Sequence, residues 1–262
     1  MEKITSLQNN RIKNIIKLRS KAHERKKQGL FIIEGAREIS LALMGNYELD
    51  SVFICPSIGF HSEPNLKEIP ANNFYEVTET VFEKIAYREA SDGILAITKP
   101  KSHSLDDLNL GKNPFVIVLE SVEKPGNLGA ILRTADAAKA DAIIVCDPST
   151  DLYNPNAVRS SVGCLFTVPV AVCSNQEALT YLQKKNIKTF AAELRTDQWY
   201  QDADFTQASA IVMGTEADGL TAFWLNNADS RIKIPMRGAI DSLNVSVSTA
   251  VITFEAMRQR GF

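Results

Sequence analysis

Residues 234–236 read Ile-Pro-Met and residues 242–247 read Ser-Leu-Asn-Val-Ser-Val, and this stretch carries the clearest pattern in the chain. Small polar residues alternate with apolar ones along residues 242–247, which is the period of a half-buried strand. Apolar residues then recur at helical spacing from Thr249 to Arg258. We therefore expect an extended, polar-lined segment that leads into a helix packed on the core. A simpler interpretation is a strand–helix junction whose serines only cap backbone N–H groups.

The composition is that of an ordinary globular protein. The chain has 262 residues, of which 45% are apolar and 23% are charged, enough for one large domain or two small ones with a real core. No run of about 18 apolar residues is present, so no membrane span is expected. The N-terminus lacks the apolar region of a secretory signal. We expect a soluble, cytoplasmic protein without a membrane partner.

Cysteine and histidine show no metal-ligand spacing. The four cysteines lie in apolar surroundings without a CxxC pair, which is typical of buried thiols in a reducing compartment. The three histidines are far apart in polar stretches. We expect neither a metal site nor a disulfide. These residues are Cys55, Cys146, Cys164, Cys173, His23, His61 and His103.

The net charge of −2 conceals a basic N-terminal arm. Residues 1–27 contain nine Lys or Arg and two Glu, a balance of +7, so the rest of the chain carries −9. Such an arm is typical of proteins that contact nucleic-acid phosphates, although a solvated basic helix has the same composition. The candidate contacts are Arg11, Lys17, Arg19, Lys21 and Arg25.

Strands and helices alternate through the first hundred residues, which predicts a small α/β domain. A helix is expected over residues 8–28 with Gly29 as its stop, and residues 56–73 are expected to form a loop. Residues 101–113 lack an apolar period and form the candidate linker, so the expected domains are 1–100 and 114–262. Further strands are expected at residues 31–33, 52–55, 74–77 and 93–98, with helices from after Gly35 to Leu43 and at 78–87.

The second half contains near-continuous Val/Ile runs separated by helical patterns, which indicates a parallel sheet covered on both faces. Ligands of such sheets bind beyond the carboxyl ends of the strands. The strand runs are 115–119, 142–146, 166–172, 189–194, 210–213 and 232–234, and the helices include 128–139 and 176–185.

Three strand ends carry polar, glycine-containing motifs. P-x-N-x-G-x-x-x-R spans residues 125–133, G-x-E-x-x-G spans residues 214–219, and the third is the opening stretch. Asn127 fits a helix cap, and Arg133 lies off the apolar side of its helix, where it suits a phosphate or a carboxylate. Ordinary explanations stay open: a salt bridge for Arg133, and placement of Glu216 at a helix N-terminus. The GxGxxG pattern is missing, which disfavours a nicotinamide-dependent enzyme.

In this order the three motifs are similar to those of the SpoU/TrmH family of RNA ribose 2′-O-methyltransferases. The resemblance covers residues 113–260. Residues 1–100 resemble the small substrate-binding domain that often precedes it, best over the Phe-Ile-Ile-Glu-Gly of residues 31–35. Ala217 stands where the family usually has Gly, which leaves Glu216 in place.

The resemblance implies a SPOUT fold of the α/β class: a Rossmann-like parallel sheet with a C-terminal trefoil knot, preceded by a small α/β substrate-binding domain. Knots are otherwise almost absent from proteins. The resemblance also implies an S-adenosylmethionine pocket formed by the knot loops, and a homodimer whose active sites are completed near the subunit interface. The implied cofactor contacts are Met213, Gly214, Ile234, Met236 and Leu243.

The implied reaction transfers a methyl group from a sulfonium to a ribose 2′-hydroxyl by in-line displacement. The enzyme must align the reacting atoms and make the hydroxyl nucleophilic. The resemblance makes Arg133 the candidate activator, and it stays open whether Arg133 abstracts the proton or stabilises the alkoxide. The residues implied to position Arg133, the ribose and a phosphate are Asn127, Glu216, Ser242 and Asn244.

RNA is the implied partner, because the 2′-hydroxyl distinguishes RNA from DNA. Ribosomal RNA is preferred by analogy with proteins that carry the small flanking domain. Transfer RNA, or an inactive RNA-binding protein of the same fold, are the alternatives. The basic arm would contact phosphates, so binding should weaken steeply with salt.

Overall fold

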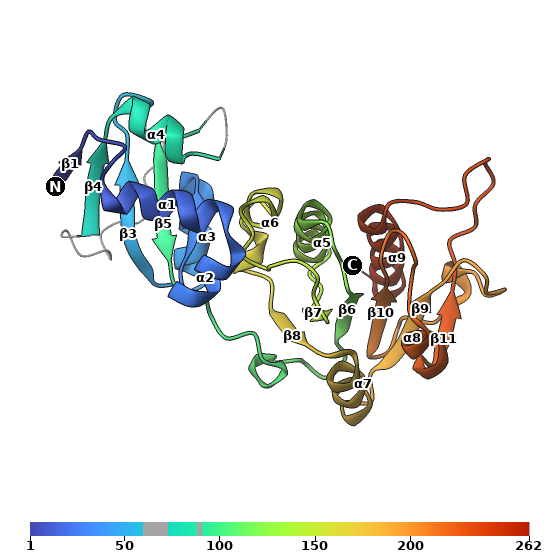
Figure 1. Ribbon diagram of the computed structural model, residues 1–262. Coiled ribbons are helices and arrows are strands. Elements are labelled where there is room, and N and C mark those ends of the chain that lie inside the picture. Colours follow the sequence, from blue (N-terminus) through green and yellow to red (C-terminus); the bar gives the residue numbers. More distant parts are fainter. Residues whose placement is uncertain (60–72, 88–90, 262) are drawn as a thin grey trace. The chain divides into compact units, whose positions relative to one another are not determined.

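The computed structural model describes residues 1–59, 73–87 and 91–261, and the chain divides into two compact units (Figure 1). Unit 1 consists of Met1–Lys101 and Asp151–Thr167, and unit 2 consists of Ser102–Thr150 and Val168–Phe262. His61 and most of the loop expected at 56–73 lie outside the described residues. A linker at 101–113 would divide the chain once, whereas residues 151–167 pack in unit 1.

A mixed five-stranded sheet forms the centre of unit 1, in the order β1-β4-β3-β5-β2. Its strands are β1 (Glu2–Ile4), β2 (Phe31–Glu34), β3 (Leu49–Ile54), β4 (Phe74–Val77) and β5 (Ile94–Thr98). β1, β4 and β3 are parallel, and β5 is antiparallel to both neighbours. The four strands expected here are confirmed. β1 is missing from the prediction because three residues are too few to show a period.

The helices of unit 1 are α1 (Asn10–Ser20), α2 (Ala22–Gln28), α3 (Ala36–Met44), α4 (Glu79–Ile85) and α6 (Pro155–Ser160). The single helix expected over 8–28 is interrupted at Lys21, whose extended backbone (φ −127°, ψ 110°) separates α1 from α2. Gly29 ends α2 in the left-handed conformation at φ 62°, which confirms it as the helix stop.

A six-stranded parallel sheet forms the centre of unit 2, in the order β11-β9-β10-β6-β7-β8, which confirms the expected architecture. The strands are β6 (Phe115–Glu120), β7 (Ala142–Cys146), β8 (Val170–Cys173), β9 (Lys188–Ala192), β10 (Ser209–Met213) and β11 (Ser230–Ile232). The strand expected from residue 166 begins only at Val170. Phe166 instead ends a short 3₁₀ helix, Cys164–Phe166, and packs on Phe31 and Tyr47 of unit 1.

Helices α5 (Pro125–Ala137), α7 (Asn175–Lys184), α8 (Ala222–Asn227) and α9 (Val245–Arg260) complete unit 2, and α9 packs against α5. The strand expected over 242–247 is wrong, because α9 already begins at Val245 with Asn244 as its N-cap. The alternation arises from a helix with apolar residues on two faces: Val245 and Ile252 are buried, while Val247 and Phe254 are exposed.

A buried carboxylate holds the start of α8 to the sheet. Glu120, at the end of β6, is fully buried and accepts hydrogen bonds from the Thr221 backbone N–H (2.8 Å) and hydroxyl (2.7 Å). Its Oε1 also accepts from the Asn175 amide (2.9 Å), which in turn accepts from the buried Trp224 indole (2.6 Å). Thr221 follows the loop after β10, so this network fixes one end of that loop. Throughout the described residues, no helix is long and apolar enough to cross a lipid bilayer.

Candidate active site

A cavity of about 490 Å³ lies beyond the carboxyl ends of β9, β10 and β11, where Ala192, Met213 and Ile232 line it. This is the edge at which parallel α/β sheets bind ligands, and the volume suits a small organic molecule. The loops after these strands and the first two turns of α9 form the remaining walls. The lining residues there fall within 193–195, 214–220, 233–243 and 245–252.

The loop after β10 needs glycine at both ends. Thr215 and Gly219 exchange backbone hydrogen bonds at 3.0 and 3.2 Å, which folds the loop back on itself. A Cβ on Gly214 would lie 2.1 Å from the carbonyl carbon of Gly219, and Gly219 has φ +70°. Glu216 therefore lies in a tight turn, and the placement at a helix N-terminus considered for it is wrong, since α8 begins only at Ala222.

The structure brings the five residues expected to contact the cofactor into one cavity. Each of them lines it: Met213, Gly214, Ile234, Met236 and Leu243. Apolar side chains and close-packed backbone suit the adenine and ribose parts of S-adenosylmethionine. Acidic side chains on the same walls suit its sulfonium cation. Among the described residues, no cluster of three or more His, Cys, Asp or Glu is placed to hold a metal ion.

Four of the five expected catalytic residues meet at or beside this cavity. Glu216 and Ser242 line it. Asn244 donates its side-chain amide to Oδ1 of Asn127 at 3.2 Å, and Lys124 at the start of α5 lies 3.5 Å from Oε2 of Glu216. The N-termini of α5 and α9 therefore converge with the loop after β10. Asn127 is not the helix cap, because α5 begins at Pro125 with Lys124 as its N-cap.

Two polar atoms in this convergence have no hydrogen-bond partner among the described residues. They are Oε1 of Glu216 and Nδ2 of Asn127, and both are buried. Buried polar atoms are nearly always satisfied in folded proteins. An acceptor on one expected motif and a donor on another are therefore left open, which indicates that a polar ligand completes the site.

Arg133 is not brought to the cavity. It is exposed on α5 and makes no hydrogen bond or ion pair with any residue in the described ranges. It lies six residues after Asn127, about 9 Å further along the helix axis. The ordinary salt bridge considered for Arg133 is therefore also absent from this part of the chain.

Further charged residues line the cavity and were not among the predicted site residues. The sequence could have indicated these residues, because each follows a strand or adjoins a motif on the same sheet edge. Asp241 directly precedes Ser242, and Arg195 lies in the loop after β9. The others are Glu193, Asp218 and Lys233.

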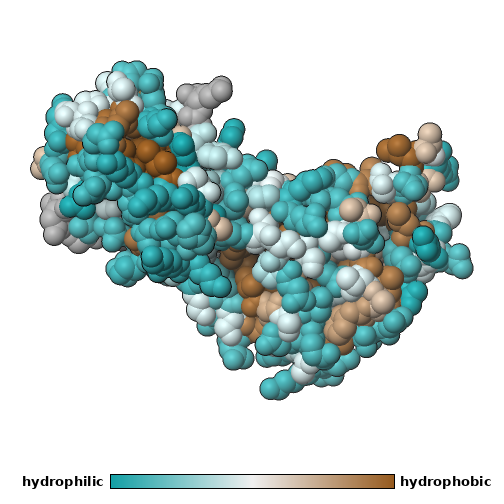
Figure 2. All heavy atoms as spheres, in the orientation of Figure 1, coloured by the Kyte–Doolittle hydropathy of each residue, from teal (hydrophilic) through white to brown (hydrophobic). Residues whose placement is uncertain are grey.

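The basic residues of the N-terminal arm do not all lie on one exposed surface. Arg25 is buried, with Nε 2.6 Å from Oδ2 of Asp151 and Nη1 2.6 Å from the carbonyl oxygen of Leu18, so its guanidinium is paired inside unit 1. Arg11 stacks on the Tyr75 ring at 4.4 Å. Lys17 and Lys21 are exposed. The α1–α2 surface is hydrophilic on the face shown in Figure 2.

Two known families match consecutive parts of the chain. Residues 114–254 match the SpoU rRNA Methylase family. Residues 9–96 match the MRM3-like substrate binding domain.

Individual relatives match along nearly the whole chain. A 23S rRNA (guanosine(2553)-2′-O)-methyltransferase from Bacillus subtilis is 27% identical, over 97% of this chain and 98% of the relative. The crystal structure of an RNA 2′-O ribose methyltransferase has 36% identity and a TM-score of 0.86, over 99% of this chain and 100% of the other. The crystal structure of the SpoU methyltransferase AviRb of Streptomyces viridochromogenes, in complex with AdoMet, has 26% identity and a TM-score of 0.88. The match covers 96% of this chain and 99% of the other.

Proposed function

Because the chain belongs to the SpoU rRNA methylase family, we propose that it transfers the methyl group of S-adenosylmethionine to a ribose 2′-hydroxyl of 23S ribosomal RNA. The observation that carries this proposal is the convergence of the three motifs at one cavity. Glu216 and Ser242 line the cavity, and the Asn127–Asn244 pair lies beside it. Family membership also implies a C-terminal trefoil knot, which the residues after β11 would form.

The cavity residues would hold the cofactor and the ribose in fixed relation. Met213, Ile234 and Leu243 offer apolar contact, and the packed Gly214–Gly219 backbone leaves no room for a side chain there. When bound, S-adenosylmethionine supplies an electrophilic methyl group. The chain's own task is alignment and activation of the hydroxyl, which positioned side chains achieve by proximity and electrostatics. The open Glu216 Oε1 and Asn127 Nδ2 would position the ribose or a neighbouring group.

A homodimer would cover the exposed apolar face of α9. Val247 and Phe254 are 47% and 40% exposed and lie seven residues apart, two turns along the same face. Large apolar side chains gathered on one helix face mark association surfaces. α5 packs beside α9 and carries Arg133. We therefore assign Arg133 to the site of the second subunit, where it would activate the 2′-hydroxyl.

Transfer of labelled methyl groups from S-adenosylmethionine to 23S rRNA tests the proposal, with ribose methylation mapped in the product. Arg133→Ala should abolish turnover and leave cofactor binding, measured by calorimetry, intact. Protein that binds RNA but gives no heat with S-adenosylmethionine is an inactive RNA-binding protein. Methylation of transfer RNA alone would reject the ribosomal substrate.

Mixed dimers test whether Arg133 acts on its partner. Arg133→Ala and a cavity variant, Gly214→Val, should each be inactive alone. After unfolding and refolding together, half of the dimers are mixed, and one of their two sites is intact if Arg133 acts across the interface. About a quarter of the wild-type activity should then return. No recovery, with mixed dimers shown by differential tags, would place Arg133 in its own subunit's site.

A further inference from the structure

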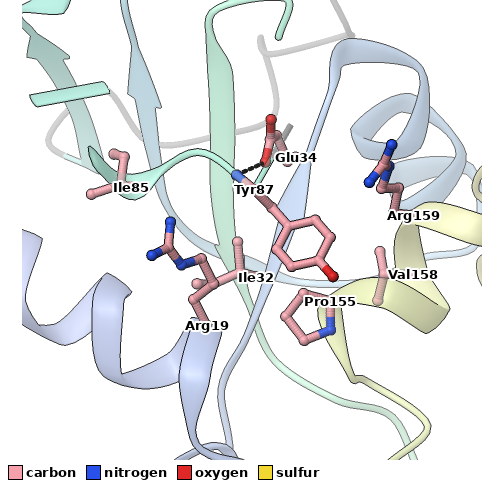
Figure 3. Close-up of a pocket in the computed structure, with 8 residues that line it drawn as sticks. All are labelled: Arg19, Ile32, Glu34, Ile85, Tyr87, Pro155, Val158 and Arg159. Carbon is pink, nitrogen blue, oxygen red and sulfur yellow. Dashed lines mark hydrogen bonds between the residues drawn. The ribbon is translucent and has the colours of Figure 1, made fainter. Parts of the chain in front are cut away.

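A second pocket lies within unit 1, which contains none of the three motifs. It is a notch of about 20 Å³ between the end of α1, strand β2, the end of α4 with the segment after it, and helix α6 (Figure 3). Its lining mixes two arginines, one tyrosine, one carboxylate and apolar side chains. The lining residues are Arg19, Ile32, Glu34, Ile85, Tyr87, Pro155, Val158 and Arg159.

Tyr87 is held in place at this notch although its side chain is exposed. Its backbone N–H donates to Oε2 of Glu34 at 2.6 Å, and Glu34 is only 8% exposed. Nη1 of Arg19 donates to the carbonyl oxygens of Lys84 (3.0 Å) and Ala86 (2.6 Å), which fixes the end of α4 just before Tyr87. The tyrosine remains 42% exposed. An exposed aromatic ring on an anchored backbone is a preorganised contact surface.

Positive charge flanks this ring. The ring of Tyr87 points toward α6 (Figure 3), and the guanidinium carbon of Arg159 lies 5.8 Å from the ring centroid. Arg159 is exposed and has no carboxylate partner among the described residues. Two guanidinium groups and the carboxylate of Glu34 leave the notch with a net positive charge. A ring beside guanidinium groups that have no carboxylate partner among the described residues suits an aromatic ligand that carries an anion.

An unpaired nucleotide is the ligand class that fits these groups. A volume of about 20 Å³ admits a single small group, so a base cannot enter the notch and would instead stack on the open part of the Tyr87 ring. Its phosphate would then lie at the arginines. Aromatic stacking beside arginine is how proteins hold unstacked bases, whereas bases in a duplex are not free to stack.

We propose that Tyr87 and Arg159, with Arg19 anchoring the segment, bind one unpaired nucleotide of the RNA substrate outside the methyl-transfer site. This inference rests on the proposed function, which supplies RNA as the partner. Arg159 belongs to the part of the chain that matches the SpoU family, yet it packs in unit 1, whose residues 9–96 match the substrate binding domain. The nucleotide site is therefore built from both family segments.

Fluorescence anisotropy tests the site with three labelled probes: a mixed-sequence single-stranded RNA of about 12 nucleotides, a blunt RNA duplex of that length and a single-stranded DNA. Tyr87→Ala should weaken single-stranded RNA binding by about 5- to 150-fold, the range for loss of one stacked base. Tyr87→Phe keeps the ring and should restore most of the affinity. Arg159→Ala should lower the slope of log affinity against log salt by about 1.

Matched measurements keep the result interpretable. Lys184→Ala removes one exposed charge from α7 of unit 2 and should leave the slope unchanged. Thermal melting should change little in Tyr87→Ala, since the substitution keeps the backbone N–H that Glu34 holds and removes an exposed side chain. Calorimetry with S-adenosylmethionine should be unaltered, because Tyr87 does not line the first cavity. Equal loss of DNA binding supports stacking and shows that the notch does not read the 2′-hydroxyl.

The proposal is overturned if Tyr87→Ala binds the single strand like wild type, if duplex and single strand weaken equally, or if wild type binds no single strand. Failure of the methyltransferase function is separate: it appears as absent S-adenosylmethionine heat and absent methylation. If the protein methylates 23S rRNA, Tyr87→Ala should raise KM for that RNA and leave kcat unchanged. Arg133→Ala should instead reduce kcat to the background rate.

Discussion

The side-chain amide of Asn244 donates to Oδ1 of Asn127 at 3.2 Å, across 117 residues of sequence, and so joins the N-cap of α9 to the first turn of α5. Oδ1 of Asn244 simultaneously accepts from the Ser246 backbone N–H (2.9 Å) and hydroxyl (2.6 Å). One asparagine therefore starts a helix and orients a residue of another motif. The two roles use different atoms, so substitutions can separate them.

Asn244→Ala should lower the free energy of unfolding by about 1 kcal/mol, because it removes the N-cap. Asn244→Asp keeps an oxygen for Ser246 and should cost less stability, but it removes the amide donor to Asn127. Both variants should lose methylation activity. Asn244→Asp should therefore be inactive while it keeps most of its stability. Urea unfolding and the methylation assay measure the two effects. An Asn244→Asp protein with full activity would show that the amide contact to Asn127 is dispensable.

Gly214→Ala should abolish S-adenosylmethionine binding, because the added Cβ would lie 2.1 Å from the Gly219 carbonyl carbon and the turn must open. Gly238→Ala is the matched control in the loop that precedes Ser242. Its Cβ meets no atom within 4 Å, so binding should stay near wild type. Calorimetric titration compares the two. Unchanged affinity in Gly214→Ala would show that the backbone of this turn does not shape the cofactor site.

Arg25→Ala should destabilise the protein by about 3 kcal/mol, because it leaves Asp151 without its cation and the Leu18 carbonyl without its donor. Lys26→Ala removes the same charge from the neighbouring exposed position and should change stability by about 0.5 kcal/mol or less. Chemical denaturation measures both. If Arg25→Ala is as stable as Lys26→Ala but binds RNA far more weakly, Arg25 is an RNA contact after all.

The capping box of α7 should contribute acid sensitivity. The backbone N–H of Ser174, and then its hydroxyl, donate to Glu177 and hold the pKa of that carboxyl below its ordinary value of 4.5. Because the folded-state pKa is the lower one, Glu177 stabilises the fold above its ordinary pKa, and this contribution is lost as the pH falls through the folded-state pKa.

Glu177→Gln keeps the capping box but cannot titrate. The difference in unfolding free energy between wild type and Glu177→Gln should therefore be constant near neutral pH. Wild type should lose stability relative to Glu177→Gln as the pH falls below the ordinary carboxyl pKa of 4.5. Urea unfolding across this range measures it. Glu83→Gln, at an exposed position of α4, serves as the control. Parallel pH profiles for wild type and Glu177→Gln would contradict the expectation.

Local patterns predicted the buried strands well. β7 occupies the expected residues 142–146, because a strand buried on both faces is a continuous apolar run that needs no distant information. The same reasoning failed at residues 242–247, where a helix with two apolar faces imitates the alternation of a strand. It also missed α6, whose six residues carry no period of their own and are ordered by packing on β2.

The strand-end motifs, their order and the family they resemble were determined by the sequence alone, because turns and buried strands depend on residues near one another in the chain. The tertiary structure decided what each charge does. Arg25 is a structural cation because Asp151, 126 residues away, meets it in a buried place. The turn that carries Glu216 meets the start of α5 through Lys124, and Asn127 of α5 meets Asn244 at the start of α9. Burial and pairing set the energy of a charge, and both are properties of the folded neighbourhood.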